Sequence, residues 1–284
     1  MVATPPRRFL FRRPSVIPGF GLTLGYALTC LSLVVLLPLA ALVAKASGLG
    51  LSGIWEVARD PRVASALRLS FGVSLAAALT ASVFGFVVAW VLTRYEFPGR
   101  RIVDAAVDLP FALPTAVAGI ALASLYAPNG LVGAELAKVG IQAAYTPLGI
   151  FIAMVFIGLP FAVRTVQPLI AEIDKEVEEA SATLGATRLM TLARVVLPPL
   201  IPAVLTGFAL AFARGVGEYG SIIFIAGNLP FVSEIAPLLI VIKLSEFDYA
   251  GAAAIATIML GISFLTLLAI NLIQAWSRRR FGYV

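Results

Sequence analysis

Six long runs of apolar residues, separated by charged or proline-rich stretches, constrain most strongly what this chain can fold into. Most of them reach the roughly 20 residues that a helix needs to cross the hydrocarbon core of a bilayer. The chain is 60% hydrophobic and only 13% charged, whereas soluble domains are about 25% charged. We therefore expect an all-α integral membrane protein with six transmembrane helices. The expected spans are residues 20–44, 69–92, 109–127, 148–163, 200–225 and 250–276.

The basic residues that flank these runs predict an orientation. Basic residues of membrane proteins concentrate on the cytoplasmic side. With both termini in the cytoplasm, the inner segments hold 14 of the 21 Lys and Arg residues and the outer segments hold seven. A cleaved signal peptide would also explain the arginine-rich start, but the first apolar run is longer than the 7–15 residues typical of such a peptide. We predict a multi-pass protein with both termini cytoplasmic.

The composition argues against several chemistries. The chain has no histidine, and its one cysteine, Cys30, lies inside the first expected span. We therefore expect neither a metal site nor catalytic residues. Asp104 and Asp108 form the one acidic pair that a membrane-embedded enzyme could use, and we interpret them instead as anchors at the start of the third span.

Residues 172–199 break the apolar character of the chain. Five carboxylates stand here between two hydrophobic blocks: Glu172, Asp174, Glu176, Glu178 and Glu179. Asp174 can cap a first helix, and the acidic residues after it suit the positive end of the helix dipole. Gly185 can adopt the left-handed turn that ends a helix, and a second helix is expected after it. A charged helical hairpin on a membrane protein predicts a polar partner, which we expect to be another protein.

The spacing within this hairpin resembles that of the permease subunits of ABC importers. Their cytoplasmic loop reads Glu-Ala-Ala, three residues, Gly, nine residues and Ile-x-Leu-Pro. This chain has Glu179-Ala180-Ser181, Gly185 and Val195-Val196-Leu197-Pro198 at the same spacing, with Ser181 and Val195 as conservative departures. The resemblance implies a type I (MetI-like) permease core whose cytoplasmic hairpin lies in a groove of an ATP-hydrolysing subunit; the alternative is a merely solvated loop. The residues then expected to couple to the ATPase are Glu178, Glu179, Ala180, Ser181, Gly185, Leu197 and Pro198.

A second polar cluster occupies residues 214–220 of the fifth expected span. Arg214 and Glu218 are four residues apart and can neutralise each other on one helix face. Ionisable groups at membrane depth are costly and mark functional sites by default, so the cluster predicts either a gate or a structural ion pair. Prolines in the third span predict a bend beside a pathway or ordinary packing. The candidate gate and translocation residues are Arg214, Gly217, Glu218, Tyr219, Gly220, Pro110 and Pro114.

Longer stretches narrow the resemblance. FARGVGEYGSIIFIAGN, SEIAPLLIVIKL and VDLPFALPTAVAGIAL look like the sulfate/thiosulfate permease subunits of the CysT type, and the similarity runs over residues 18–280. It implies a bacterial inner-membrane location, a second related permease, two copies of an ATP-binding subunit and a periplasmic sulfate-binding protein, with membrane lipid around them and no nucleic acid. The binding protein is expected to dock on the outer loops 45–68 and 229–249.

The sequence contains no GxxxxGK[ST] phosphate loop, so ATP and Mg²⁺ are expected to be used by the partner ATPase and no cofactor by this chain. We expect an ATP-driven sulfate and thiosulfate permease that works by alternating access, coupled through residues 172–199. A molybdate or tungstate permease is the alternative, and a passive anion channel would need no such hairpin. Three segments are expected: residues 1–65 (arm, first span and outer loop), 66–276 (permease core) and 277–284 (basic cytoplasmic tail).

Overall fold

The structure, a computed structural model, describes residues 19–281 of the 284-residue chain and the side chains of residues 19–276. Its regular secondary structure in this range is entirely helical. The N-terminal arm with its four arginines and the side chains of the basic C-terminal tail lie outside the described residues. The chain divides into two compact units, residues 1–44 and 45–284, which are described separately.

The first unit supplies most of one apolar helix. It consists of α1 (Phe20–Leu31), a π-helical turn η1 (Ser32–Leu36) and the start of α2 (Leu37–Ser47). Together they form a run of 28 residues with a mean hydropathy of 2.5. The π-helical turn ends directly before Leu37-Pro38, as expected where a proline ring would clash with the carbonyl four residues earlier. This run matches the first expected span.

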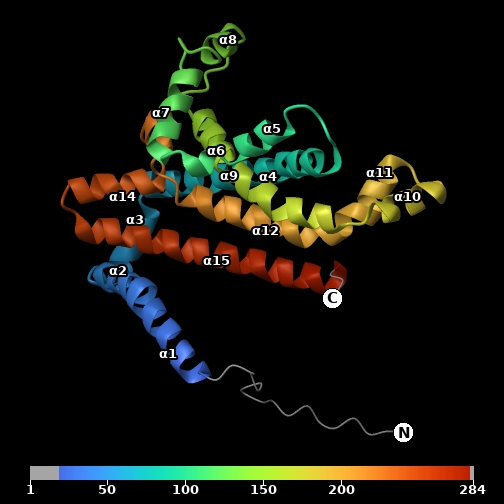
Figure 1. The fold of residues 1–284 in the computed structure, drawn as a ribbon. Helices are drawn as coiled ribbons and strands as arrows, with labels where there is room; N and C mark the ends of the chain where they lie inside the picture. Colours follow the sequence, from blue (N-terminus) through green and yellow to red (C-terminus); the bar gives the residue numbers. More distant parts are fainter. Residues whose placement is uncertain (1–18, 282–284) are drawn as a thin grey trace. The chain divides into compact units, whose positions relative to one another are not determined.

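Four more helices in the second unit are long and apolar enough to cross a membrane (Figure 1). They are α4 (Pro61–Arg94), α9 (Pro147–Glu172), the run Arg188–Val216 and α15 (Tyr249–Phe281). The run Arg188–Val216 joins α11 (Arg188–Thr191), the π-helical turn η2 (Leu192–Val196) and α12 (Leu197–Val216). They match the second, fourth, fifth and sixth expected spans, so the described residues hold five candidate spans.

The third expected span, residues 109–127, is not one continuous helix. It is divided into α6 (Leu109–Ala112) and α7 (Thr115–Tyr126). Pro114 pushes the residue before it out of the helical region, and Leu113 is extended with φ −86° and ψ 135°. The 12 residues of α7 span only about 18 Å, and the count of six membrane crossings stays a prediction.

The fifth expected span also ends earlier than its apolar run. We expected it to reach residue 225, but α12 stops at Val216 and a turn separates it from the short helix α13 (Ile222–Ile225). Three glycines between residues 215 and 220 weaken helix propensity enough to explain the break.

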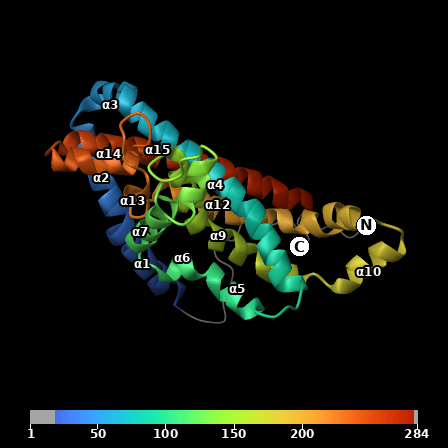
Figure 2. The same ribbon diagram turned by 90° about the horizontal axis from the view of Figure 1, so that it is seen from above.

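Short helices connect these elements. They are α3 (Gly50–Arg59), α5 (Arg100–Val107), α8 (Gly133–Lys138), α10 (Lys175–Thr183) and α14 (Ala236–Ser245). The hairpin helices α10 and α11 lie at one end of the bundle and α14 at the other, in both views (Figures 1 and 2).

Helices α4, α9 and α12 pack closely because small residues line their contacts. A Cβ atom on Gly85 of α4 would collide with Ala162 of α9, and one on Gly207 of α12 would collide with Thr165 of α9. Such small residues let helix backbones approach each other in membranes. At the hairpin end these three helices share an apolar core with α5 and η2: Ala89, Leu92, Val107, Val163, Val166, Ile170, Val196, Leu200 and Ala203. This core fixes the base from which the hairpin projects.

The opposite end of the bundle is fixed by an ion pair. Arg62 at the start of α4 donates two hydrogen bonds, of 2.8 and 2.7 Å, to the carboxylate of Glu234. Glu234 is only 2% exposed, so its charge depends on this arginine. The backbone N–H of Ala236 also donates to Ser70 Oγ at 2.9 Å. These contacts attach the loop before α14 to α4.

Candidate functional site

The acidic segment folds into the expected helical hairpin. Helix α10 carries three of the five carboxylates, Glu176, Glu178 and Glu179, and α11 returns toward the bundle (Figures 1 and 2). Asp174 occupies the N-cap position of α10, as expected, but its side chain makes no capping hydrogen bond. The acidic residues Glu176 and Glu178 lie in the first turn, where they favour the positive end of the helix dipole.

Gly185 makes the turn between the two arms. Its φ is +85°, in the left-handed region that glycine adopts without steric cost. The Ala186 N–H donates to the Ser181 carbonyl at 3.1 Å, and the Gly185 N–H donates to the Ala182 carbonyl at 2.9 Å. This pair of bonds is a Schellman motif. The expected left-handed turn at Gly185 is therefore present.

The two arms of the hairpin are tied together, and the second arm runs without a break into α12. The hydroxyls of Ser181 and Thr191 lie 2.5 Å apart. Thr187 caps α11 by accepting from the Met190 N–H at 3.3 Å. The π-helical turn η2 then ends before Leu197-Pro198, as η1 does before its own proline. Arg188–Val216 is one helical run, so no loop separates the second arm of the hairpin from α12.

Arg94, the last residue of α4, attaches the hairpin to the bundle. Its Nη2 atom lies 2.7 Å from Glu178 Oε1 and donates to the Ile173 carbonyl at 2.9 Å. Its guanidinium group also lies 5.5 Å from the ring centroid of Trp90, within the range of a cation–π contact. The Arg94 side chain is only 9% exposed. The ion pair thus holds α10 against the end of α4, the bond to Ile173 holds the chain just before α10, and Trp90 on α4 itself supports the guanidinium group.

The tip of the hairpin is exposed and partly apolar. Leu184 is 88% exposed and Leu189 is 75% exposed. Glu179 is also exposed, in contrast to Glu178, which Arg94 holds. Apolar side chains gathered with a carboxylate on an exposed turn are typical of a protein-binding surface.

The second predicted cluster forms an ion pair. Arg214 on the last turn of α12 pairs with Glu218. Glu218 is buried and also accepts from the Ser221 N–H at 2.9 Å and the Ser221 hydroxyl at 3.0 Å. Three donors thus neutralise and orient one buried carboxylate, as a buried charge requires. The arginine keeps about a third of its side chain exposed, so it can still meet a second anion.

The turn after α12 packs against the break in the third expected span. A Cβ atom on Gly220 would collide with Thr115 Oγ1, and a Cβ on Gly119 would collide with the Ser221 backbone. Thr115 follows Pro114, the N-cap residue of α7, so Gly220 packs against the residue next to Pro114. Tyr219 packs beside this turn against a separate apolar cluster. Pro110 lies in the short helix α6, which packs on α9 instead.

Asp104 and Asp108 anchor the start of the third expected span. Arg164 of α9 donates to Asp108 at 2.8 and 2.6 Å and to Asp104 Oδ1 at 2.7 Å. The Arg164 guanidinium holds the pKa of Asp104 below its usual value, chiefly through this hydrogen bond. Both aspartates serve as acceptors in a structural network, which supports the anchoring interpretation. The described residues contain no group of three His, Cys, Asp or Glu that could hold a metal ion.

We expect Arg164→Met to lower the free energy of unfolding by about 1–2 kcal/mol, after allowance for the partial exposure of the network. A folded-state pKa below the ordinary value stabilises the fold above the ordinary pKa and loses that contribution as the pH falls. The difference in Tm between the variant and the native protein should therefore narrow below about pH 4. Thermal unfolding in detergent at several pH values measures this, and an unchanged Tm at neutral pH would contradict the anchoring role.

Three residues that contribute most to these sites were not singled out from the sequence as site residues. Arg94 and Arg164 count in the sequence only among the basic residues that flank the expected spans, and no local pattern marks Thr115. Their partners Glu178, Asp108 and Gly220 are 84, 56 and 105 residues away along the chain, so no local pattern connects them. The one signal in the sequence concerns Arg94, which stands at the end of an apolar run between Trp90 and Tyr95.

Comparison with known proteins places these features in one family. The family model for the binding-protein-dependent transport system inner membrane component matches residues 81–283. The chain belongs to this family. The match begins within α4 and includes the hairpin, the continuous run Arg188–Val216 and the cluster after α12. Members of this family are permease subunits, so the chain is a membrane transport component.

Individual relatives of this inner membrane component are similar over almost the whole chain. The sulfate transport system permease protein CysT of Synechocystis sp. is 51% identical over 96% of this chain and 93% of its own length. The protein of the same name from Escherichia coli is 49% identical over 94% of this chain and 97% of its own. A subunit in the crystal structure of a bacterial alginate ABC transporter, in complex with an alginate pentasaccharide-bound periplasmic protein, has the same fold with a TM-score of 0.71. It is 17% identical, and the match covers 93% of this chain and 95% of that subunit.

Proposed function

We propose that this chain is a permease subunit of an ATP-driven importer that moves sulfate across the bacterial inner membrane. The observation that carries the proposal is the identity of about one half with sulfate permeases along more than nine tenths of both chains. The chain itself is not an enzyme, because the family separates the permease from the ATPase. A single subunit provides one half of the pathway, and a second related permease supplies the other half.

The hairpin is the proposed contact with the ATPase. Its exposed tip offers Leu184, Leu189 and Glu179 to a partner, while Arg94 fixes its base. We propose that two copies of an ATP-binding subunit bind the hairpins of the paired permeases in the cytoplasm and use ATP and Mg²⁺. Because the second arm continues into α12, closure of the ATPase tilts this helix and switches access from one side of the membrane to the other. In this assembly α6 and α7 together complete a sixth crossing, and both termini are cytoplasmic.

The end of the bundle opposite the hairpin is the proposed dock for a periplasmic sulfate-binding protein. Phe231 and Phe247 have φ values of +65° and +61°, a conformation that is rare for bulky residues and costs backbone strain. Both rings are nevertheless exposed, Phe247 to 78%, and Tyr249 lies in edge contact with Phe247. Strained loops that present aromatic rings to solvent are suited to protein recognition.

The turn after α12 is the proposed gate element. The structural interpretation of the Arg214–Glu218 pair has direct support from the hydrogen bonds of Glu218, and the exposed third of Arg214 leaves room for a transient contact with an oxyanion. If Arg214 lines the pathway, Arg214→Gln lowers the rate of sulfate uptake about tenfold while Tm falls only slightly, because glutamine retains a donor for Glu218. Uptake and Tm that both match the native importer would leave the pair with a structural role alone.

Transport by the reconstituted importer tests the proposed function. The chain is purified with the second permease, the ATPase and the binding protein, and uptake of labelled sulfate into vesicles is measured with and without ATP. We expect uptake that requires ATP and competition by thiosulfate. Stronger competition by molybdate or tungstate would favour the alternative cargo, and uptake without ATP would indicate a passive channel.

A further inference from the structure

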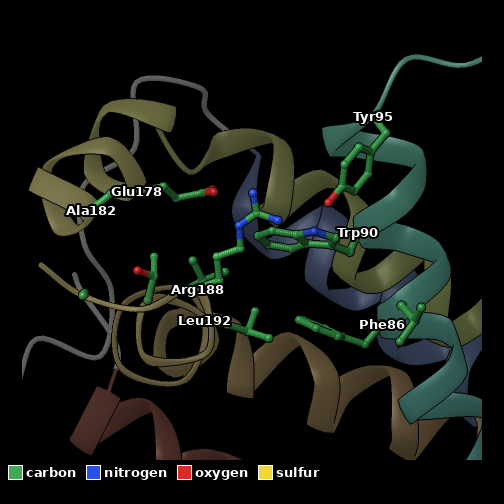
Figure 3. A pocket seen from close by; sticks show the side chains of 11 residues that line it. Phe86, Trp90, Tyr95, Glu178, Ala182, Arg188 and Leu192 are labelled. Atoms are coloured by element: carbon green, nitrogen blue, oxygen red, sulfur yellow. The ribbon is translucent and has the colours of Figure 1, made fainter.

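A cavity of about 520 Å³ lies between the end of α4 and the hairpin (Figure 3). Its α4 wall consists of Phe86, Val87, Trp90 and Tyr95. The opposite wall comes from the hairpin, including its turn, and from η2: Glu178, Ala182, Ala186, Arg188, Thr191, Leu192 and Val196. The volume is that of a small-molecule site. Neither the coupling contact at the hairpin tip nor the cluster after α12 uses it.

One unpartnered cation reaches into this cavity. Figure 3 shows the side chain of Arg188 extending from the hairpin toward Trp90. Among the described residues Arg188 forms neither an ion pair nor a side-chain hydrogen bond. Glu178 lines the same cavity but is held by Arg94 at 2.7 Å. A positive charge therefore faces an otherwise neutral cavity, and it favours an anionic ligand.

The cavity walls change from apolar to polar in one direction. On α4, Phe86 lies deeper in the helix and stacks on Trp90 with ring centroids 6.3 Å apart. Tyr95 follows where the helix ends, and tryptophan and tyrosine favour the boundary between hydrocarbon and headgroups. One turn earlier on α4, the exposed side chain of Val83 continues the apolar surface formed by Phe86 and Val87. Along the cavity the apolar side chains of α4 come first, then Trp90 and Tyr95, and then the charge of Arg188. A phospholipid has its groups in the same order: acyl chain, glycerol and phosphate.

We propose that this cavity binds an anionic phospholipid, with its phosphate on Arg188 and an acyl chain along Phe86 and Val87. Basic pockets between helices at the cytoplasmic membrane surface are suited to such headgroups. A carboxylate from a partner protein would pair with Arg188 but would leave the exposed apolar side chains of Val83 and Val87 uncovered. A lipid covers both. The bound lipid would fill the space between α4 and the hairpin and so stiffen the connection through which the hairpin moves.

Photo-cross-linking in the assembled importer identifies the occupant. p-Benzoylphenylalanine replaces Phe86 in one variant and Phe84 in a matched control, because Phe84 lies two residues away on α4 and does not line the cavity. After irradiation in native membranes, mass spectrometry identifies what is attached. We expect phospholipid at both positions, with anionic headgroups enriched about fivefold at position 86 over position 84, as one arginine at the membrane surface allows.

The arginine that causes the enrichment is tested in the same background. Arg188→Gln should remove the enrichment at position 86, while Arg194→Gln should preserve it, because Arg194 is exposed on the same helical run outside the cavity. Equal lipid composition at the two positions, enrichment that survives Arg188→Gln, or a peptide of a partner subunit attached at position 86 would each overturn the proposal. Loss of the enrichment in excess free glycerol phosphate would also overturn the proposal, because it would indicate a site for small anions. None of these results depends on which oxyanion is transported.

Discussion

Gly185→Val is expected to abolish ATP-driven uptake while leaving the protein inserted in the membrane. Gly185 has a φ of +85°, which costs an L-residue about 1–2 kcal/mol and is worse for a β-branched side chain. Apart from the glycine and its two chain neighbours, no atom lies within 4 Å of the position where its Cβ would be, so the penalty is one of backbone conformation and not of packing. The turn should relax by opening the Schellman bonds, and the tip would then leave the position from which it can contact the ATPase.

Gly185→Asn is the matched control, because asparagine tolerates the left-handed region better than other residues with a side chain. We expect sulfate uptake near the native rate for the asparagine variant and uptake no higher than that of ATP-free vesicles for the valine variant. Membrane content of the permease and the ATPase rate of the assembled complex are measured in parallel. Native uptake by the valine variant would show that the turn at Gly185 is not needed for coupling.

Arg94→Met is expected to loosen the hairpin from α4 and to lower both stability and coupling. The substitution removes the ion pair with Glu178, the bond to the Ile173 carbonyl and the contact with Trp90. Breaking a largely buried ion pair from one side leaves the other charge poorly solvated, which costs about 2–3 kcal/mol here. We expect a lower Tm and less sulfate taken up for each ATP hydrolysed, because part of the hairpin's movement is lost at its base.

The neighbouring carboxylates separate the structural effect from the partner contact. Glu178→Gln should lower Tm, and its effect should not add to that of Arg94→Met in a double-mutant cycle, because both remove the same pair. Glu179→Gln should leave Tm unchanged, because Glu179 is exposed, yet reduce coupling through the lost ATPase contact. Fully additive effects of the Arg94 and Glu178 substitutions would contradict their pairing.

Local sequence signals predicted the hairpin better than they predicted the spans. The signals for the hairpin are its acidic residues, Gly185 and the proline in the first turn of α12. Each of them influences the backbone within a few residues, so α10, the turn and α11 appear where expected. The bounds of the third span were extrapolated from hydropathy; its prolines indicated a bend, but not that Pro114 extends Leu113 and divides the helix. The fifth span was overextended for a similar reason, because Ile222–Ile225 is apolar but follows a glycine-rich break.

The contacts that position the candidate sites could not be read from the sequence. Three contacts each join residues that are more than 50 positions apart. They are the Arg94–Glu178 ion pair, the ion pair of Arg164 with Asp108, and the packing of Gly220 against Thr115. Such contacts depend on which helices become neighbours, and a single sequence does not determine that. The Arg214–Glu218 pair was predictable because one turn of one helix brings the two residues together.

Cross-linking from the tip of the hairpin tests the coupling account most directly. Cys30 is replaced by serine and Leu184, 88% exposed at the tip, by cysteine, and a short thiol-to-amine cross-linker is applied to the assembled importer. The account predicts one dominant product that joins this chain to the ATP-binding subunit, weakened when a nonhydrolysable ATP analogue moves that subunit. Labelling of Leu184→Cys by a membrane-impermeant maleimide added outside intact cells, with no product containing the ATPase, would contradict it.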